Sequence, residues 1–144
     1  MSGEGPAAGR DKLEIENMYL CGSTFTRVSL KGARVEDSHM MGMTVRDVDA
    51  SGMTWDDVNL SGSAIGDANL SGATVTGANC AGIAFTDVSL KGARFRDVSL
   101  AGARISDADL TDLAIVDARY EGMTIDGIAV IDLLARWRSG RDGA

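Results

Sequence analysis

The chain has 144 residues, enough for one domain, and its hydrophobic content of 44% includes only 5% aromatic residues. So few large side chains argue against a round globular core and favour a thin, elongated interior. The net charge is −7 at pH 7, and residues 13–132 carry 18 acidic against 9 basic side chains, so −9. Such an acidic body excludes nucleic-acid binding by phosphate neutralisation, and it favours a protein partner with a basic groove.

Residues 1–12 are rich in Gly and Ala, and we expect them to be a mobile tail. They contain no apolar run typical of a secretory signal, and no 18-residue apolar stretch that would span a membrane follows. Cys21 and Cys80 occupy different phases of the pattern described next, so a disulfide between them is not expected. Two unpaired thiols predict a reducing cytoplasm.

A five-residue pattern runs without insertion or deletion from Leu13 to Asp132. Every fifth residue is mostly large and apolar, and a smaller apolar residue stands two positions before it, as Ala68 does before Leu70. A period of five fits neither an α-helix nor a simple strand. The pattern therefore predicts a repeat architecture over residues 13–132.

A ten-residue pattern is superposed on the shorter one. Gly stands two positions after every second large apolar residue, from Gly22 to Gly122, with a gap at position 112, and Asp stands at most of the alternate positions. Gly relieves the steric limits of a tight corner, and Asp can close one by accepting a backbone N–H bond on its side chain. These positions are predicted to be corners between short strand-like sides.

Residues 133–144 end the repeats. Asp132 is a suitable N-cap for a short helix on which Val130, Leu134 and Trp137 share one face. About eight residues do not hold a helix alone, so this one is expected to pack on the open end of the last repeat. A solenoid end left bare invites pairing, and the segment is therefore predicted to cap the solenoid or to form a homodimer. The residues proposed for that contact are Ile131, Leu133, Leu134 and Trp137.

The units Ala68-Asn69-Leu70, Ala78-Asn79-Cys80 and Ala108-Asp109-Leu110 match the A-(D/N)-L-x-x pattern, and Val58-Asn59-Leu60 is close. In these motifs the sequence resembles the pentapeptide-repeat family, over about five-sixths of the chain. The resemblance implies an all-β, right-handed quadrilateral β-helix with four units to a coil, hence about six coils, followed by a short C-terminal helix. It also implies that the helix caps the solenoid or joins two copies.

Four units to a coil bring residues twenty positions apart into register. Successive coils then pair as parallel strands at a spacing of ~4.8 Å. Trp55 is oversized for its column of inward side chains, and its neighbour Ala50 is the only alanine among the large apolar positions. We predict that Ala50 makes room for Trp55.

No residue set in the sequence predicts catalysis, a metal site or a cofactor. The single histidine, His39, is expected on the surface with no phased acid or nucleophile. No His/Cys cluster has zinc spacing, and the glycines form corners rather than a phosphate loop. The chain is therefore predicted not to be an enzyme.

Two rows of aspartates are the candidate binding residues, and two interpretations stay open. The first is that they are only turn residues; the second is that they form a negative stripe which imitates a nucleic-acid backbone. One row lies along one corner and the other along the opposite corner, where Gly77 breaks it. The rows are Asp47, Asp67, Asp87 and Asp107, and Asp37, Asp57, Asp97 and Asp117.

We expect a non-catalytic, rigid protein-binding module with an acidic surface, whose partner the sequence does not name. The resemblance implies an alternative, because some pentapeptide-repeat proteins mimic DNA, bind DNA gyrase and confer fluoroquinolone resistance. The chain differs from several of those proteins in its shortness and in having no loop between coils. Direct binding to nucleic acid or to a membrane is not expected.

Overall fold

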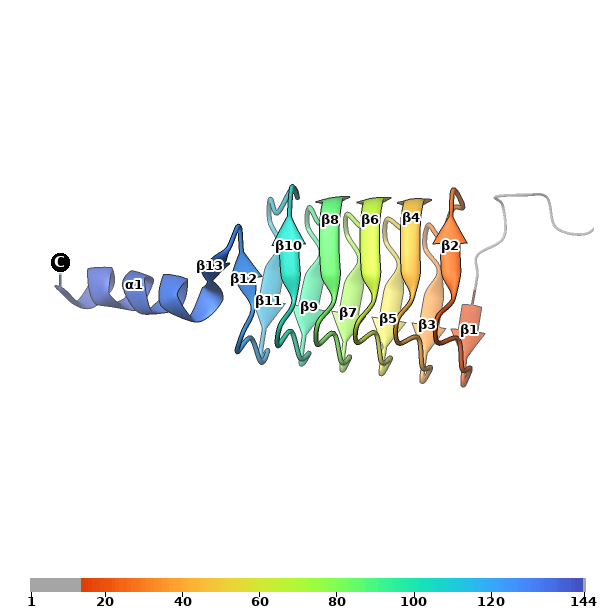
Figure 1. Ribbon diagram of the computed structural model, residues 1–144, viewed down its shortest axis with the longest axis horizontal. Coiled ribbons are helices and arrows are strands. Elements are labelled where there is room, and N and C mark those ends of the chain that lie inside the picture. Colours follow the sequence, from red (N-terminus) through yellow and green to blue (C-terminus); the bar gives the residue numbers. More distant parts are fainter. Residues whose placement is uncertain (1–13, 144) are drawn as a thin grey trace, which may run out of the picture.

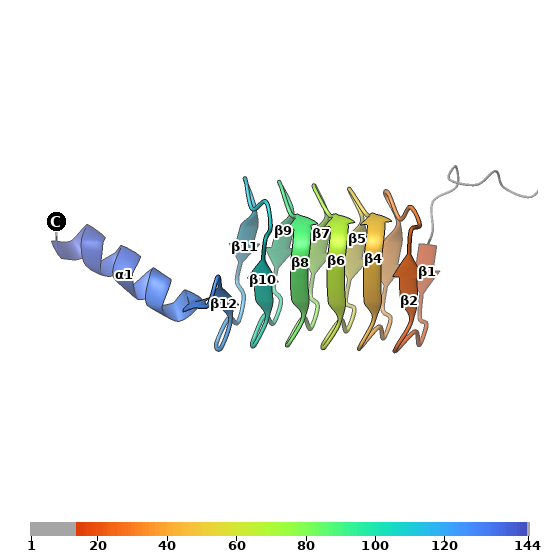
Figure 2. The same cartoon turned by 45° about the horizontal axis from the view of Figure 1, so that its top comes forward.

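The computed structural model describes residues 14–143, and the tail predicted for residues 1–12 lies outside them. The described chain forms a stack of coils along one long axis, with a helix at its C-terminal end (Figure 1). Two parallel sheets form opposite sides of the stack, and from β1 to β12 the odd- and even-numbered strands alternate between them (Figures 1 and 2).

The first sheet has six strands in the order β1-β3-β5-β7-β9-β11. Each strand is three residues long and pairs with the strand twenty residues later, so that Glu14 is opposite Arg34. The strands are β1 (Glu14–Glu16), β3 (Arg34–Glu36), β5 (Thr54–Asp56), β7 (Thr74–Thr76), β9 (Arg94–Arg96) and β11 (Ala114–Val116).

The second sheet has seven strands in the order β13-β12-β10-β8-β6-β4-β2. Its pairs are parallel with the same twenty-residue offset, except that β13 is antiparallel to β12. The strands are β2 (Thr24–Thr26), β4 (Thr44–Asp49), β6 (Ala64–Asn69), β8 (Ala84–Ser89), β10 (Arg104–Ser106), β12 (Thr124–Ile125) and β13 (Ile128–Ala129).

Single parallel bridges link the two remaining sides of each coil. One series runs from Tyr19 through His39 to Arg119, and another links residues such as Ser29 and Asp49. A coil therefore has four sides and twenty residues, which confirms the predicted four-sided β-helix of about six coils.

The inward columns form one continuous core. Met40, Leu60, Cys80 and Leu100 are each at most 1% exposed, one coil apart. Two polar side chains also lie inside, and both are hydrogen-bonded. Ser63 Oγ, for example, accepts a hydrogen bond from Met43 N and donates one to Met40 O, both at 3.1 Å. At the two ends the same columns are only partly buried, as at Leu20 and Tyr120. The core is thus complete in the middle and open at its ends.

The C-terminal end departs from the regular coil. The chain turns back after Ile125, β13 pairs antiparallel with β12, and helix α1 (Val130–Gly143) follows at once. Asp132 lies in the first turn of α1 and not before it, so the predicted N-cap is wrong. The helix runs away from the solenoid along its axis (Figures 1 and 2). No helix in residues 14–143 is long and apolar enough to cross a membrane.

Candidate interaction surfaces

The eight predicted aspartates occupy the corners of the solenoid, and all are exposed. Each has a positive φ between 48° and 55°, in the left-handed region that Asp and Asn tolerate better than most side chains. Gly takes the same conformation at the other corners, for example at Gly72 with φ of 69°. The prediction that these positions are corners is confirmed.

The expected side-chain bonds at those corners are not formed. Among the described residues, only one aspartate of the two rows has a side-chain hydrogen bond. It is Asp67, which accepts from Arg46 Nη2 at 3.2 Å in an exposed ion pair. Hydrogen bonds of the predicted kind, from a backbone N–H to a side chain two residues earlier, occur at other positions instead. Asn59 Oδ1, for example, accepts from Ser61 N at 3.0 Å. Asn69, Asn79, Asp49 and Asp109 do the same. The aspartates of the two rows are therefore suited to these corners by their backbone conformation, and their carboxylates remain available for contact with a partner.

Each row of aspartates has a regular spacing, and one row is interrupted by another residue. In-register pairing places successive aspartates of a row ~4.8 Å apart. The row of Asp37, Asp57, Asp97 and Asp117 is broken by Gly77. There the carboxylate of Asp57 leans into the free space, and its Oδ1 lies only 2.6 Å from where a Cβ on Gly77 would stand. The other row begins after Arg27, which holds the same positive φ.

Two further acids, Asp49 and Asp109, lie on the side that adjoins these corners. The hydroxyl and N–H of Ser51 hold the pKa of Asp49 below its ordinary value, with help from Lys31. Thr111 acts on the pKa of Asp109 in the same way, with help from Lys91. Both carboxylates are thus stabilised as anions by their own corner.

The C-terminal residues proposed for contact with a partner are mostly exposed. Ile131 is 52% exposed, Leu133 41% and Trp137 62%, whereas Leu134 is half-buried. Val130 and Leu134 face the open end of the coil and line a groove of about 410 Å³ together with residues of the last coil, among them Ile115, Tyr120 and Met123. The helix therefore packs through its first turns only, and the expected shared face of Val130, Leu134 and Trp137 is not buried along its length.

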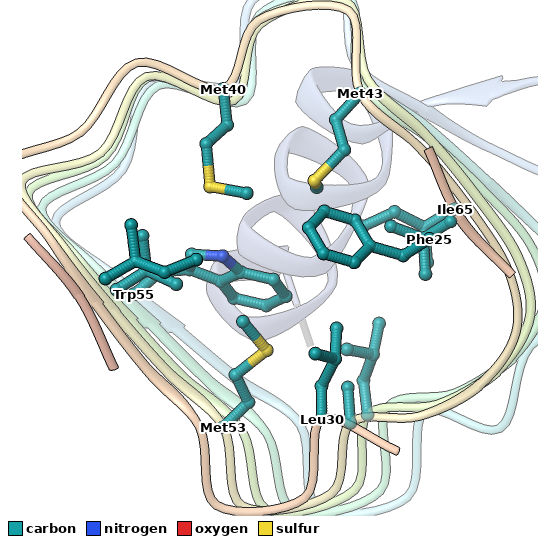
Figure 3. Close-up of a pocket in the computed structure, with 12 residues that line it drawn as sticks. Phe25, Leu30, Met40, Met43, Met53, Trp55 and Ile65 are labelled. Atoms are coloured by element: carbon teal, nitrogen blue, oxygen red, sulfur yellow. The ribbon is translucent and has the colours of Figure 1, made fainter. Parts of the chain in front are cut away.

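A small cavity inside the core bears on the predicted fit between Ala50 and Trp55. A cavity of about 10 Å³ has Trp55 and Ala50 among its lining residues. The thioether side chains of Met40 and Met53 lie on either side of the indole ring, and Met43 lies next to the ring of Phe25 (Figure 3). The indole Nε1 is buried with no hydrogen-bond partner. The cavity is apolar and no larger than the smallest volume that holds one water molecule, so it is packing space and not a ligand site.

His39 is exposed, as predicted, and its ring stacks on Tyr19 with centroids 4.7 Å apart. In residues 14–143 no group of three or more His, Cys, Asp and Glu side chains is placed to hold a metal ion. Cys21 is exposed and Cys80 is buried, and neither is in a disulfide.

The comparisons with known proteins agree with the repeat. The family model described as pentapeptide repeats matches residues 56–92 and 78–112. No curated protein matches the chain. Among solved structures, a pentapeptide repeat protein (Rfr23) from the cyanobacterium Cyanothece 51142 is 16% identical with a TM-score of 0.52, over 79% of this chain and 88% of that one. The Arabidopsis thaliana thylakoid lumen pentapeptide repeat protein is 24% identical with a TM-score of 0.52, over 67% and 70%.

A weaker match is QnrB1, a plasmid-mediated fluoroquinolone resistance protein. It is 12% identical with a TM-score of 0.35, over 92% of this chain and 97% of that one. All these identities are below the level at which a shared activity follows, and the likeness to the first two structures shows the fold alone.

Proposed function

Because the chain is a pentapeptide-repeat protein, we propose that it acts as a non-catalytic, rigid module that binds a protein partner through an acidic surface. The observation that supports this most is the pair of aspartate rows. Their backbones are fixed by the coils, their carboxylates are exposed, and within residues 14–143 only Asp67 is in an ion pair. A partner that presents a basic groove would meet preorganised charges, which lowers the cost of ordering on binding.

Binding is proposed in preference to catalysis because the described side chains bring together no nucleophile, base and oxyanion donor. His39 contacts the ring of Tyr19, and the hydroxyls of Ser51 and Thr111 donate to the carboxylates of Asp49 and Asp109 within their own corners. The proposed site of action is the cytoplasm, in keeping with two free cysteines.

A second candidate is a DNA mimic that binds DNA gyrase or a related topoisomerase, and the regular spacing of the rows favours it. One row carries a charge every ~4.8 Å, so both rows together give about one charge per 2.4 Å of axis. Duplex DNA carries about one per 1.7 Å. The charge density is therefore of the same order, although the rows lie on opposite corners.

A supercoiling assay with purified gyrase separates the two candidates. The wild-type chain is compared with a variant in which Asp47, Asp67, Asp87 and Asp107 are all changed to Asn, and with a matched variant of Asp37, Asp57, Asp97 and Asp117. Asn tolerates the same left-handed backbone, so both variants keep the corners while losing the charge.

Inhibition by the wild type that weakens in one variant and not in the other would support the DNA mimic and identify the row that binds. No inhibition by the wild type would refute it. The acidic protein-binding module is then tested by affinity capture at low and high salt. Partners that remain bound equally to wild type and to both Asn variants would refute a role for the rows.

We also propose that the chain forms a homodimer through its C-terminal helix. Three apolar residues of the helix, Ile131, Leu133 and Trp137, are exposed, and Val130 and Leu134 of the same helix line an open, largely apolar groove, which supports this contact. Changing Leu133 and Trp137 together to Ser alters exposed positions and leaves the coils intact. A particle mass that halves relative to the wild type supports the dimer, and an unchanged mass refutes it.

A further inference from the structure

The outer face of the sheet β1-β3-β5-β7-β9-β11 is not covered by any other element of residues 14–143, and its charges are separated by end. In-register pairing makes two columns of outward side chains. One reads Glu14, Arg34, Thr54, Thr74, Arg94, Ala114, and the other reads Glu16, Glu36, Asp56, Thr76, Arg96, Val116. Acids dominate the first three strands, and the only charges on the last three are the two arginines of β9.

The acidic end and the basic end do not neutralise each other within one molecule. Arg34 Nη2 pairs with Glu36 Oε2 at 2.7 Å on the same strand. Arg94 and Arg96 are exposed and form no ion pair in the described part of the chain. Their neighbours in the sheet are threonines on one side and Ala114 and Val116 on the other. Glu14 and Glu16 are also exposed, and they form no ion pair with any residue that the structure describes.

We propose that this face binds a second copy of the chain, face to face and with the coil order reversed. A twofold axis along β5 keeps each column opposite itself and places the first strand of one copy over the fifth strand of the other. Glu14 then faces Arg94 of the second copy, and Glu16 faces Arg96. Symmetry repeats both contacts, so four pairs of opposite charges are matched.

The corner beside this face supports the same register. Its positions read Asn17, Asp37, Asp57, Gly77, Asp97 and Asp117. With β5 on the axis, Asp97 faces the neutral Asn17 of the other copy, and Asp37 faces Gly77. The two breaks in the row therefore fall where aspartates would otherwise oppose each other. Only Asp56 and Asp57, on the axis itself, face their own copies.

The alternative orientation is disfavoured by the same charges. A twofold axis along the solenoid keeps the coil order and reverses the strands. Glu14 then faces Glu16, and Arg94 faces Arg96, while the only opposite charges that meet are Arg34 and Glu36. Like charges placed opposite each other select against that arrangement.

The size of the face determines the strength of the contact. In the proposed register five strands of each copy overlap, which at ~4.8 Å span about 19 Å, and three residues at ~3.3 Å give a width of about 10 Å. A stable complex commonly buries about 800 Å² on each partner, which is well above this footprint. The association is therefore weak and depends on charge, so that it dissociates as salt is raised.

The test is sedimentation equilibrium of the full chain at about 0.01 M and about 1 M salt, where the screening length falls from roughly 30 Å to roughly 3 Å. All proteins carry the Leu133→Ser and Trp137→Ser changes, so that any contact through the helix does not contribute. We expect an association step at low salt that is lost at high salt. Changing Arg94 and Arg96 to Glu, or Glu14 and Glu16 to Arg, should weaken that step by at least about tenfold.

Combining both pairs of changes in one chain exchanges the two ends and should restore the association. Changing Arg104 to Glu, on the opposite sheet, is the matched control and should have no effect. Circular dichroism confirms that each variant is folded. Absence of a salt-dependent step in the starting protein, or failure of the combined variant to recover it, would overturn the proposal.

The register has its own test with a short bifunctional maleimide. In a chain that carries Cys21→Ser, Thr54→Cys lies on the proposed axis and should cross-link to its own copy at low salt. Thr74→Cys faces Arg34 of the other copy and should cross-link less. Equal cross-linking at the two positions would contradict an axis along β5.

Discussion

Ala50 and Trp55 line the same small cavity in the core and are 1% and 3% exposed. The pair occupies neighbouring sides of the solenoid, where the missing bulk of the alanine is compensated by the indole ring. Together with Met40 and Met53, Ala50 thus helps to fit a side chain that is larger than its column otherwise holds.

Replacing Ala50 with Leu should therefore overpack this part of the core. Overpacking costs typically about 1–3 kcal/mol, which corresponds to a fall in melting temperature of roughly 3–10 °C for a chain of this size. Thermal unfolding followed by circular dichroism measures it, with exposed Ala64→Leu on β6 as the control. An unchanged melting temperature for Ala50→Leu would show that the two residues do not compete for space.

Gly77 should resist an acidic side chain more than a neutral one. A Cβ at this position meets the carboxylate of Asp57, which can move aside, so the steric term is small. A new carboxylate would stand between Asp57 and Asp97, and each like-charge contact at ~5 Å costs about 0.8 kcal/mol in a water-like dielectric. Gly77→Asp is expected to be less stable than Gly77→Asn by roughly 1 kcal/mol in chemical denaturation.

Salt and a second mutation distinguish charge from sterics in this comparison. The gap between Gly77→Asp and Gly77→Asn should close at about 1 M salt, where screening is strong. It should also narrow when Asp57 is changed to Asn. A gap that survives both changes would mean that the backbone, and not the carboxylate, sets the cost.

Acid should destabilise the side that carries Asp49 and Asp109. Hydrogen bonds from Ser51 and Thr111 lower the pKa values of these carboxyls below 3.8 in the folded chain. A lowered folded pKa favours the folded state above the unfolded pKa, and this contribution is lost as pH falls through the folded pKa. Both groups therefore contribute stability that is present near neutral pH and disappears below about pH 4.

The variants Ser51→Ala and Thr111→Ala remove the hydroxyl donors. NMR titration of the two carboxyl groups should show the pKa of each rising towards its ordinary value. Their loss of stability relative to the wild type should be seen at pH 7 and should vanish in acid. Equal losses at both pH values would attribute the effect to packing.

The two cysteines should react very differently. Cys21 is exposed, whereas burial raises the pKa of Cys80 to about 12 and removes its thiolate at neutral pH. Titration with Ellman's reagent should find one reactive thiol in the native chain and two in denaturant. Cys21→Ser should react only after unfolding, and fast native reaction of that variant would show that the core opens readily.

The repeat could be predicted because each position in it is constrained by one physical requirement. The columns through Leu60 and Cys80 must be apolar, and the corners at Gly72 and Asp67 must tolerate a positive φ, so sequence alone shows both. What holds the corners was not visible in the same way. Asn59 and Asp67 are both small polar residues near a turn, and only the backbone shows that Asn59 bonds to Ser61 N while Asp67 does not bond to its own corner.

The C-terminal end was harder for a related reason. The five-residue pattern continues through Ile125 and Val130, and both remain partly buried, so the sequence does not reveal that the coil stops between them. The reversal depends on Asp126 and Gly127, which take positive φ of 51° and 78° in succession. Two such residues together make a tight turn instead of one more side.

That reversal also sets the length of the solenoid. A coil that ended in a flat parallel edge would be a template on which another molecule could continue, coil upon coil, into a fibre. The antiparallel β13 occupies that edge of the second sheet, and the helix that follows stands in the path of any molecule stacking on the end. Strand β13 and helix α1 thus block the addition of further coils at this end of the solenoid.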